Sequence, residues 1–470
     1  MSATQETLVA LNDQNSSDWE ISVAELNSSR ALQPFNIKNV ITDIEIYEHI
    51  GKPYITGSFI MTDTERVLER FDIQGAETFT LKLQTAQYST NPIEKTFIID
   101  TVKSVVRGNE TAQVVQLHFT EDIGYKSALH NVNRSYSGTP EKIIATIAAD
   151  YFNKEVVSSA EGNVSNTMKV IVPNLDPIET MEWIKNRSST SEGYPFYLFS
   201  NFATSKLFFL DLGVMLSQTA INEKYPYMYS QSNASVDNAN RQQKIYEYDN
   251  SIQERTFNLM KSGFVGAQHS FYDITNATFI RKKFSVHKDV YDKTEGLNPR
   301  QSRPVISYDH IIDEKPISEY NSRQLFNTYA SKNFVDGKAY SEEPDQGQHS
   351  RKIVSIALKQ LLAKNPMEIV IDGREFLVGG ESKSVGNIIK VIFKATDHGH
   401  TGQKIDRKMS GDYLVVGARH VFTKEKCRSK LLISKIANYN SDIYTQGSNE
   451  KWFLLLINNI TVMKPAGFWE

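Results

Sequence analysis

One short segment, Asp397-His398-Gly399-His400, places metal-binding side chains next to one another. Two imidazoles separated by one residue, beside a carboxylate, could supply three ligands from a single loop. The sequence offers no recognisable fourth ligand and no second His-x-His pair. A glycine-containing polar loop between two strands accounts for the same residues. We therefore predict no metal site and no cofactor, with metal binding near His398 and His400 as the alternative.

Sequence signatures of enzymes are missing. The chain has no Gly-x-Ser-x-Gly nucleophile elbow, no phosphate-binding P-loop, no His-Glu-x-x-His motif and no EF-hand loop. Carboxylates are plentiful, but an acid and nucleophile pair that meets only in space leaves no sequence pattern. We therefore predict no catalytic residue, and an undetected hydrolase is the alternative.

Aromatic residues near the C-terminus are candidates for a docking surface. Aromatic side chains are favoured in protein interfaces. A core strand followed by a frayed end accounts for the same pattern. The candidate partner or oligomer interface consists of Trp452, Phe453, Leu455, Phe468 and Trp469.

The composition is that of a globular protein with several domains. At 470 residues the chain is too long for one ordinary core, so two to four domains are expected. The apolar run at 452–457 is far shorter than the ~20 residues of a membrane-spanning helix. A single cysteine, Cys427, excludes an internal disulfide and fits folding in a reducing cytoplasm. We expect no membrane-spanning segment.

The charge pattern argues against tight binding of nucleic acid. The formal net charge is −3, and no long basic block occurs. The densest short run, Arg281-Lys282-Lys283, falls in a predicted strand and is interpreted as a solvated edge. A near-neutral wall could still line a passage for DNA, because it would not hold the phosphates.

Strand patterns fill residues 31–122, after a polar N-terminal extension at 1–30 that would be disordered alone. A hairpin is expected where the pattern of 35–47 breaks at Gly51-Lys52-Pro53 and resumes at 54–60. Further strands are predicted at 78–84, 96–106 and 113–120. Several strands with short connections predict a small barrel or sandwich.

The pattern becomes helical within residues 123–215. Thr139-Pro140 marks one helix start and Asp176-Pro177 a second, since both pair a capping side chain with a proline suited to the first turn. Strands are predicted at 168–172, 194–199 and 206–212. This order of helices and strands predicts a compact α/β domain.

Residues 216–365 are predicted to connect this domain to a second strand-rich unit. They contain strands between 246 and 290 and a helix at 348–364. Within 366–437, strands are predicted at 367–371, 375–378, 386–393, 412–422 and 430–434, with a tight turn at Asp372-Gly373. The two strand-rich units are similar in size, so a structural duplication is a hypothesis. Residues 438–470 form a C-terminal extension.

Several segments resemble the central hub proteins of phage tails and the related spike proteins of secretion systems. Thr139–Ile144 resembles the helix that opens their α/β domain. Val172–Pro177 with Trp183 resembles the junction before its second helix, and 194–199 and 207–212 resemble its closing strands. In the last unit the hub-like segments are 376–379, 388–392, 408–415 and Arg419-His420-Val421. The order of segments over about 31–437 is most similar to the hub of T-even-type myophage baseplates.

The resemblance implies an α+β, β-rich fold. Two tail-tube-like antiparallel β-barrel domains, at 31–122 and 366–437, would accompany the α/β domain and an irregular connecting region. A homotrimeric ring would then present six barrels to a six-fold tail tube above and a three-fold spike below. Its channel would let DNA pass without specific binding. Implied partners are the tail tube or tube-initiator protein, the central spike protein and baseplate wedge proteins.

The resemblance also implies a place, the tail baseplate of a virion assembled in the host cytoplasm, and a structural role without catalysis. Two alternatives remain. The hub could carry a peptidoglycan-hydrolase activity, which needs a paired-carboxylate cleft. The chain could also be a hub or spike component of a bacterial contractile injection system, with a separate protein supplying the tip.

Overall fold

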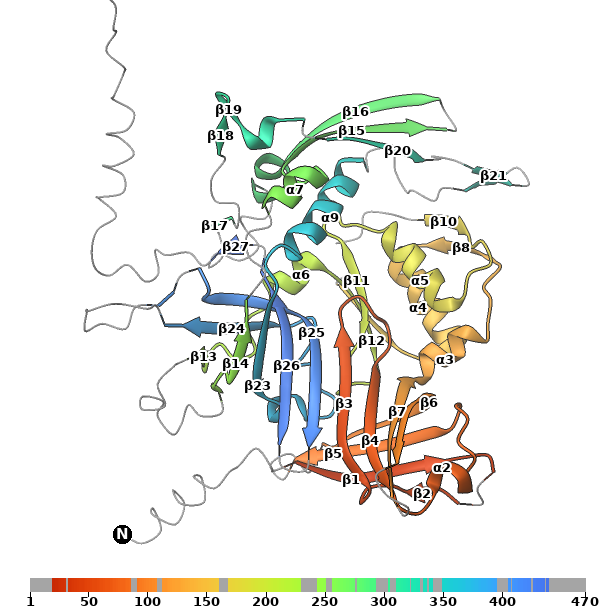
Figure 1. The fold of residues 1–470 in the computed structure, drawn as a ribbon. Coiled ribbons are helices and arrows are strands. Elements are labelled where there is room, and N and C mark those ends of the chain that lie inside the picture. Colours follow the sequence, from red (N-terminus) through yellow and green to blue (C-terminus); the bar gives the residue numbers. More distant parts are fainter. Residues whose placement is uncertain are drawn as a thin grey trace, which may run out of the picture.

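The fold is rich in strands and contains few helices (Figure 1). The computed structural model describes residues 19–30, 33–85, 91–107, 112–159, 168–229, 243–250, 256–274, 277–292, 303–304, 310–321, 323–329, 333–335, 338–340, 349–394, 405–406, 408–423, 426–435 and 437–438. Its largest element is a sheet of 13 strands, most of them antiparallel.

The first strand group packs around a cluster of phenylalanines. Its elements are β1 (Trp19–Asn27), β2 (Phe35–Asn36), β3 (Ile41–His49), β4 (Thr56–Asp63), α2 (Val67–Arg70), β5 (Thr78–Thr85), β6 (Ile93–Arg107) and β7 (Gln113–Glu121). The predicted hairpin of β3 and β4 and the predicted strands β5, β6 and β7 are confirmed. Alternate residues point inward, so Phe59, Phe79, Phe97 and Phe119 meet in the core with ring centroids 4.6–6.4 Å apart.

Strand β1 lies in the segment that the sequence places in the N-terminal extension. It pairs with β5 from Trp19 opposite Thr85 to Asn27 opposite Thr78. Ala24 and Leu26 are buried in the first core. A bulge between Ile21 and Val23 breaks the alternation of its apolar residues, so the segment has no regular strand pattern, and the strand is stabilised by the neighbour it pairs with.

The α/β domain has the predicted order of elements. It comprises α3 (Asp122–Ala128), β8 (Ser135–Gly138), α4 (Pro140–Phe152), β9 (Val156–Ser158), β10 (Met168–Ile171), α5 (Pro177–Asn186), β11 (Phe196–Ser200), β12 (Leu207–Asp211) and α6 (Leu212–Ser217). The Asp176 carboxylate caps α5 by accepting a hydrogen bond from the Glu179 amide at 2.9 Å. One face of α4, including Ile144 and Ile147, is buried against these strands.

The second strand group comprises β13 (Tyr227–Tyr229), β14 (Glu247–Asp249), β23 (Met367–Asp372), β24 (Ile388–Phe393), β25 (Gly411–Thr423) and β26 (Cys427–Ser434). The predicted strand at 375–378 is wrong, because a 3₁₀ turn, η7 (Arg374–Phe376), leads into a loop there. The chain does turn directly after Asp372, as predicted, but it turns into η7, and β23 pairs with β26 and β14. The apolar side chains of this loop are buried in place of a strand, and Leu377 enters the first core.

The remaining elements lie beyond the second group, at the upper end of Figure 1. They are α7 (Thr256–Ser262), β15 (Gly266–Asp273), β16 (Thr278–Ser285), the π-helical η4 (His287–Tyr291), β17 (Arg303–Pro304), β18 (Ile311–Ile312), β19 (Lys315–Pro316), η6 (Ile317–Glu319), β20 (Gln324–Tyr329), β21 (Asn333–Val335), β22 (Lys338–Tyr340), α9 (His349–Leu362) and β27 (Ala437–Asn438). The predicted helix α9 is confirmed. It buries Ile353, Leu358 and Leu361 between the upper strands and the large sheet.

The two strand groups form one continuous sheet. Strand β25 pairs with β26 on one side, and on the other it pairs first with β24 and then with β3 of the first group. We call the β3–β25 pairing the seam. It runs antiparallel from Gly417 opposite His49 to Thr423 opposite Asp43. The seam joins segments that are far apart in the sequence, and the polar residues described next lie on its two faces.

Candidate functional site

The two faces of the seam carry different polar side chains, because successive residues of a strand point to opposite sides. Glu48 and His420 lie on the inner face, and Glu45 and Arg419 lie on the outer face. Glu48 is opposite Ala418, and His420 is opposite Ile46, so the two inner side chains are diagonal neighbours.

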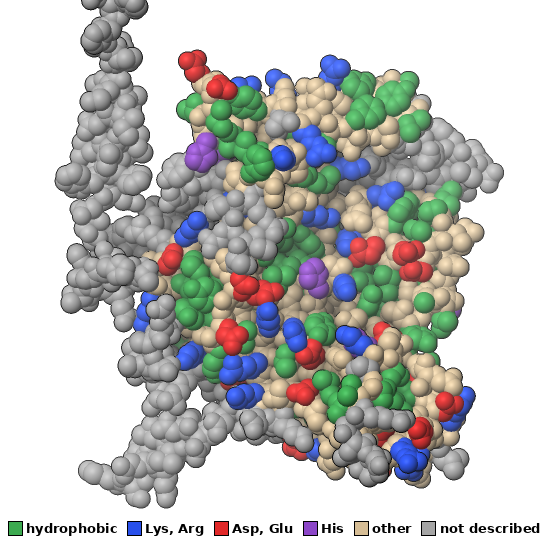
Figure 2. Space-filling model, in the orientation of Figure 1, with side chains coloured by type: hydrophobic (Ala, Val, Ile, Leu, Met, Phe, Trp, Pro, Cys, Tyr) green, Lys and Arg blue, Asp and Glu red, His purple; other side chains and the backbone are tan. Residues whose placement is uncertain are grey.

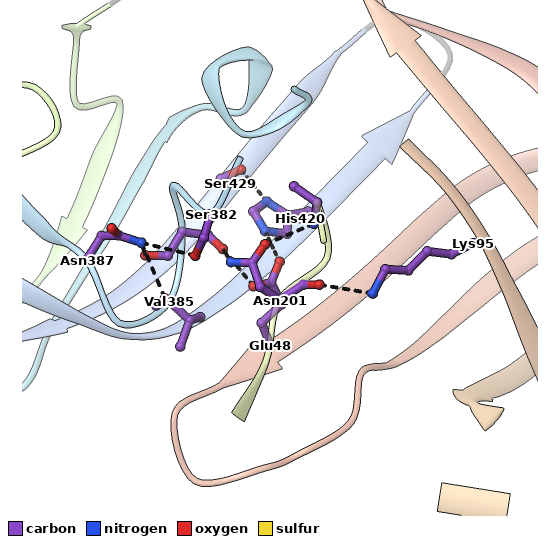
Figure 3. A network of polar contacts seen from close by, with 10 residues as sticks. Glu48, Lys95, Asn201, Ser382, Val385, Asn387, His420 and Ser429 are labelled. Atoms are coloured by element: carbon purple, nitrogen blue, oxygen red, sulfur yellow. Dashed lines mark hydrogen bonds and ion pairs between the residues drawn. The ribbon is translucent and has the colours of Figure 1, made fainter. Parts of the chain in front are cut away.

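The inner face holds a buried row of three polar residues (Figure 3). His420 Nε2 is 3.0 Å from Glu48 Oε1, and His420 Nδ1 is 2.7 Å from the Ser429 hydroxyl oxygen. Glu48 is 4% exposed, His420 1% and Ser429 0%. In one tautomer of the ring, Nε2–H donates to the carboxylate and Nδ1 accepts from the serine hydroxyl. The row links β3, β25 and β26.

The same carboxylate extends the row to the α/β domain. The Ser384 hydroxyl donates to Glu48 Oε2 at 2.6 Å, and the Asn201 amide donates to the Ser384 oxygen at 2.8 Å. Asn201 directly follows β11 and is fully buried. We call Glu48, His420, Ser429, Ser384 and Asn201 the junction network. It connects both strand groups and the α/β domain through hydrogen bonds.

A second buried cluster, Lys95–Glu121–Lys154, lies beside the junction network. Lys154 Nζ is 2.8 Å and Lys95 Nζ is 3.5 Å from Glu121 Oε1. Lys95 also donates to the carbonyl oxygen of Asn201 at 2.9 Å, which joins the cluster to the network. Glu121 Oε2 accepts from the Ser200 hydroxyl at 3.0 Å. The cluster therefore ties the ends of β6 and β7 to the residues around β11.

The charges of this cluster are stabilised by one another. Burial lowers the pKa of Lys95, and the attraction of Glu121 only partly offsets that effect. Burial acts to raise the pKa of Glu121, but the two lysines and the hydrogen bonds outweigh it, so this pKa is lowered. Buried charges that are paired in this way are costly to separate.

The outer face carries an exposed counterpart of the buried row. Arg419 Nη2 is 2.6 Å from Glu45 Oε1, and the Tyr47 hydroxyl also donates to Glu45. Burial acts to raise the pKa of the Glu45 carboxyl, yet the bonds from Arg419 and Tyr47 lower it overall. Burial and the neighbouring Glu45 raise the pKa of Tyr47 to about 12. Both faces of the seam are therefore bridged by a carboxylate of β3 and a basic residue of β25.

Serine, histidine and glutamate in hydrogen-bonded order are also the groups of a nucleophilic triad. In such a triad the serine must reach a substrate and a donor pair must receive the oxyanion. Ser429 is fully buried between paired strands. Cavities of about 360 Å³ and 210 Å³ lie beside Trp19 and beside Tyr194, and none of the three residues lines either one. The arrangement is suited to holding strands together.

Backbone contacts reinforce the junction on the side of the loop that follows η7. The Gly379 amide donates to the Asn91 carbonyl at 2.9 Å, and the Gly380 amide donates to the Ala203 carbonyl at 2.7 Å. A Cβ at position 379 would lie 2.5 Å from the Pro92 carbonyl oxygen. Only glycine allows this approach, so the loop packs directly on the first strand group.

The residues predicted as sites from the sequence lie elsewhere. The candidate interface residues Trp452, Phe453, Leu455, Phe468 and Trp469 fall outside the described residues, as does the Asp397–His400 segment. Within the part of the chain that the structure describes, no group of three or more His, Cys, Asp or Glu residues could hold a metal ion. In that same part, no helix has the length and hydropathy needed to cross a membrane.

Sequence reasoning missed the junction network. Glu48 and His420 are separated by 372 positions, and nothing in the sequence pairs them. One signal for these residues was present in the sequence. Arg419 and His420 belong to a segment that resembles hub proteins, and both residues bridge the seam. A carboxylate pair spaced three apart in the β3 strand, Glu45 and Glu48, is a second signal, because charged residues in a central strand need partners.

The solved structures that match this chain include phage tail proteins and a component of the type VI secretion system. A tail protein from Neisseria meningitidis MC58 matches with a TM-score of 0.50 and 12% identity, over 89% of this chain and 98% of that chain. The 43 kDa tail protein of prophage MuSo2 from Shewanella oneidensis matches with a TM-score of 0.49 and 9% identity, over 88% and 98% of the two chains. The E. coli c3393 protein, a type VI secretion component, gives a TM-score of 0.40 and 8% identity over 88% and 78%.

Neither a protein-family model nor a curated protein matches the chain. The first of the structural matches spans nearly the whole of both chains, so the chain has the fold of a phage tail protein. The resemblance to tail proteins that was inferred from the sequence is therefore confirmed at the level of the fold.

Proposed function

We propose that this chain is the structural hub of a phage-tail baseplate. Three copies would form a ring that adapts the six-fold tail tube to the three-fold central spike, with a channel for DNA ejection. The observation that carries the proposal is the seam, because it joins two strand groups of one chain edge to edge in a fold shared with a phage tail protein.

The strand groups support this stoichiometry. The first group runs β3-β4-β7-β6-β5-β1, and the second contains β14-β23-β26-β25 with β24 and β13 beyond. A bridge between Met228 and Lys244 brings β13 beside the segment that leads to β14, which favours closure of the second group into a barrel. Three chains with two such groups each supply six barrels, and a head-to-tail contact that rotates by a third of a turn closes the ring.

The junction supports a structural role for the chain. A subunit that transmits force between a tube and a spike needs its two groups at a fixed angle. The junction network and the Lys95–Glu121–Lys154 cluster supply directional contacts among both groups and the α/β domain. The net charge of −3 is also compatible with a channel that does not retain DNA.

Light scattering coupled to size-exclusion chromatography tests the proposal on the purified full chain. A trimer has three times the 53.4 kDa mass of the chain, and negative-stain images of that fraction should contain rings with a central opening. A chain that stays monomeric at every concentration, and that also fails to form rings when mixed with tail-tube and spike proteins of the same particle, contradicts the hub assignment.

A further inference from the structure

The upper sheet has an edge strand that no other described strand covers. Its order is β16-β15-β20, and within the described residues β16 pairs only with β15. Figure 1 places β16 at the upper rim of the molecule. Five of its eight residues are exposed, and only the end at Phe284 is buried in the core. Unpaired backbone N–H and C=O groups along such an edge are available to another strand.

The face beside this edge carries exposed aromatic side chains. Phe279 of β16 is 48% exposed and Phe326 of β20 is 62% exposed. Their rings have centroids 6.2 Å apart across β15, where Phe326 is opposite Ser270 and Phe279 is opposite Tyr272. The guanidinium carbon of Arg281 is 5.0 Å from the centre of the Phe279 ring. Figure 2 shows hydrophobic and basic side chains gathered at this upper end of the molecule.

The charge of the edge restricts what can pair with it. Arg281, Lys282 and Lys283 are consecutive, so alternation places two of them on one face of the sheet and Lys282 on the other. No ion pair joins any of them to another described residue. A strand laid along β16 therefore meets positive charge on both faces. A second copy of β16 would be repelled by like charges, whereas an acidic strand would be attracted.

We propose that the β16 edge binds an extended, acidic segment of another protein by β-strand addition. The segment would form backbone hydrogen bonds along Thr278–Lys283, place carboxylates opposite the three basic residues, and pack an apolar side chain against Phe279 and Phe326. This proposal rests on the edge and its charges and does not depend on the hub assignment.

The test uses the full-length chain and a fluorescein-labelled eight-residue peptide, the length of β16, with two valines at each end and four glutamates between them. Binding is followed by fluorescence anisotropy at physiological salt. The acidic peptide should bind, and its lysine–valine counterpart should not. N-methylation of alternate peptide bonds should weaken binding at least about tenfold, because it removes the donors that a strand needs.

Variants locate the site. Arg281→Glu/Lys283→Glu should weaken binding of the acidic peptide at least about tenfold and allow the lysine–valine peptide to bind. Phe326→Ser should weaken binding of the acidic peptide although the charge of the edge is unchanged. The matched control is Lys103→Glu, which reverses an exposed charge on β6 of another sheet and should leave binding unchanged. All of these side chains except Phe326 are exposed cations, and melting curves of each variant verify that the fold is intact.

Two results overturn the proposal. Equal binding of the N-methylated and unmodified peptides would mean that only charge is recognised, without strand addition. Tighter binding of a single-stranded oligonucleotide than of the acidic peptide, lost in Arg281→Glu/Lys283→Glu, would assign the aromatic and basic face to nucleic acid.

Discussion

The substitution His420→Leu tests whether the junction network holds the two strand groups together. It leaves the Glu48 carboxylate and the Ser429 hydroxyl without their imidazole partner, although both remain buried. Breaking a buried pair by removing one member costs about 3–5 kcal/mol, because the remaining charge stays desolvated. Since about 1.4 kcal/mol is a factor of ten in an equilibrium, opening of the seam should become at least about a hundredfold more frequent.

Hydrogen exchange measured by mass spectrometry reports this local opening at fixed protein concentration. Amides of β3 and β25 should exchange faster in His420→Leu, whereas those of β5 and β6 should change little. The matched control is Arg419→Leu, the adjacent residue on the outer face of the same seam. Its side chain is 44% exposed, and an exposed ion pair contributes about 0–1 kcal/mol, so exchange should rise at most about fivefold.

A double variant separates the loss of packing from the loss of the Glu48–His420 hydrogen bond. Glu48→Leu/His420→Leu removes both polar side chains, and an apolar pair in place of buried polar partners is often no less stable. The amides of β3 and β25 should therefore exchange more slowly in the double variant than in His420→Leu alone. The double variant should also cost less free energy than the sum of the two single variants in a double-mutant cycle. If Arg419→Leu opens the seam as much as His420→Leu does, or if the double variant is worse than either, the network does not hold the seam.

Three further predictions concern the second strand group and its contact with the first. Burial lowers the pKa of Lys435 to about 7, so between that pH and its ordinary 10.5 the unfolded chain binds the proton that the folded chain has released. Stability in urea should therefore rise by about 2 kcal/mol from pH 7 to pH 9, and Lys435→Met should abolish this rise. Gly379→Ala should lower the melting temperature, because the added methyl group meets the Pro92 carbonyl oxygen. Gly380→Ala measures the separate cost of a positive φ, because the Cβ there would meet nothing within 4 Å. Leu377→Ala should destabilise the first strand group by about 2–5 kcal/mol in urea, a cost that an exposed site such as Leu129 should not share.

Local patterns in the sequence were sufficient for most of the elements. Alternation predicted β5, β6 and β7, and capping residues followed by proline predicted the starts of α4 and α5. These signals come from neighbours in the chain, so they survive without tertiary context. Their order was also enough to indicate the fold shared with a tail protein.

Features that depend on distant partners were not predictable. The sequence of β1 has a weak strand pattern. The strand forms because it pairs with β5, which is distant in the sequence. The run at 375–378 is as apolar as a strand, but its side chains fill a gap between the two cores, so periodicity alone misassigned it. The junction network combines residues of both groups and of the α/β domain, and no local rule brings Glu48 to His420.

The choice of polar residues for the seam has a physical reason that an apolar seam would lack. A one-residue slip between β3 and β25 would turn every side chain to the opposite face. If β3 slipped, Glu45 would face the core without Arg419, and Glu48 would lose His420. The polar pairs therefore penalise such a slip on both faces, in addition to the cost of exposing apolar side chains. The register fixes the angle between the two strand groups, and the proposed ring would repeat any error in that angle in every subunit.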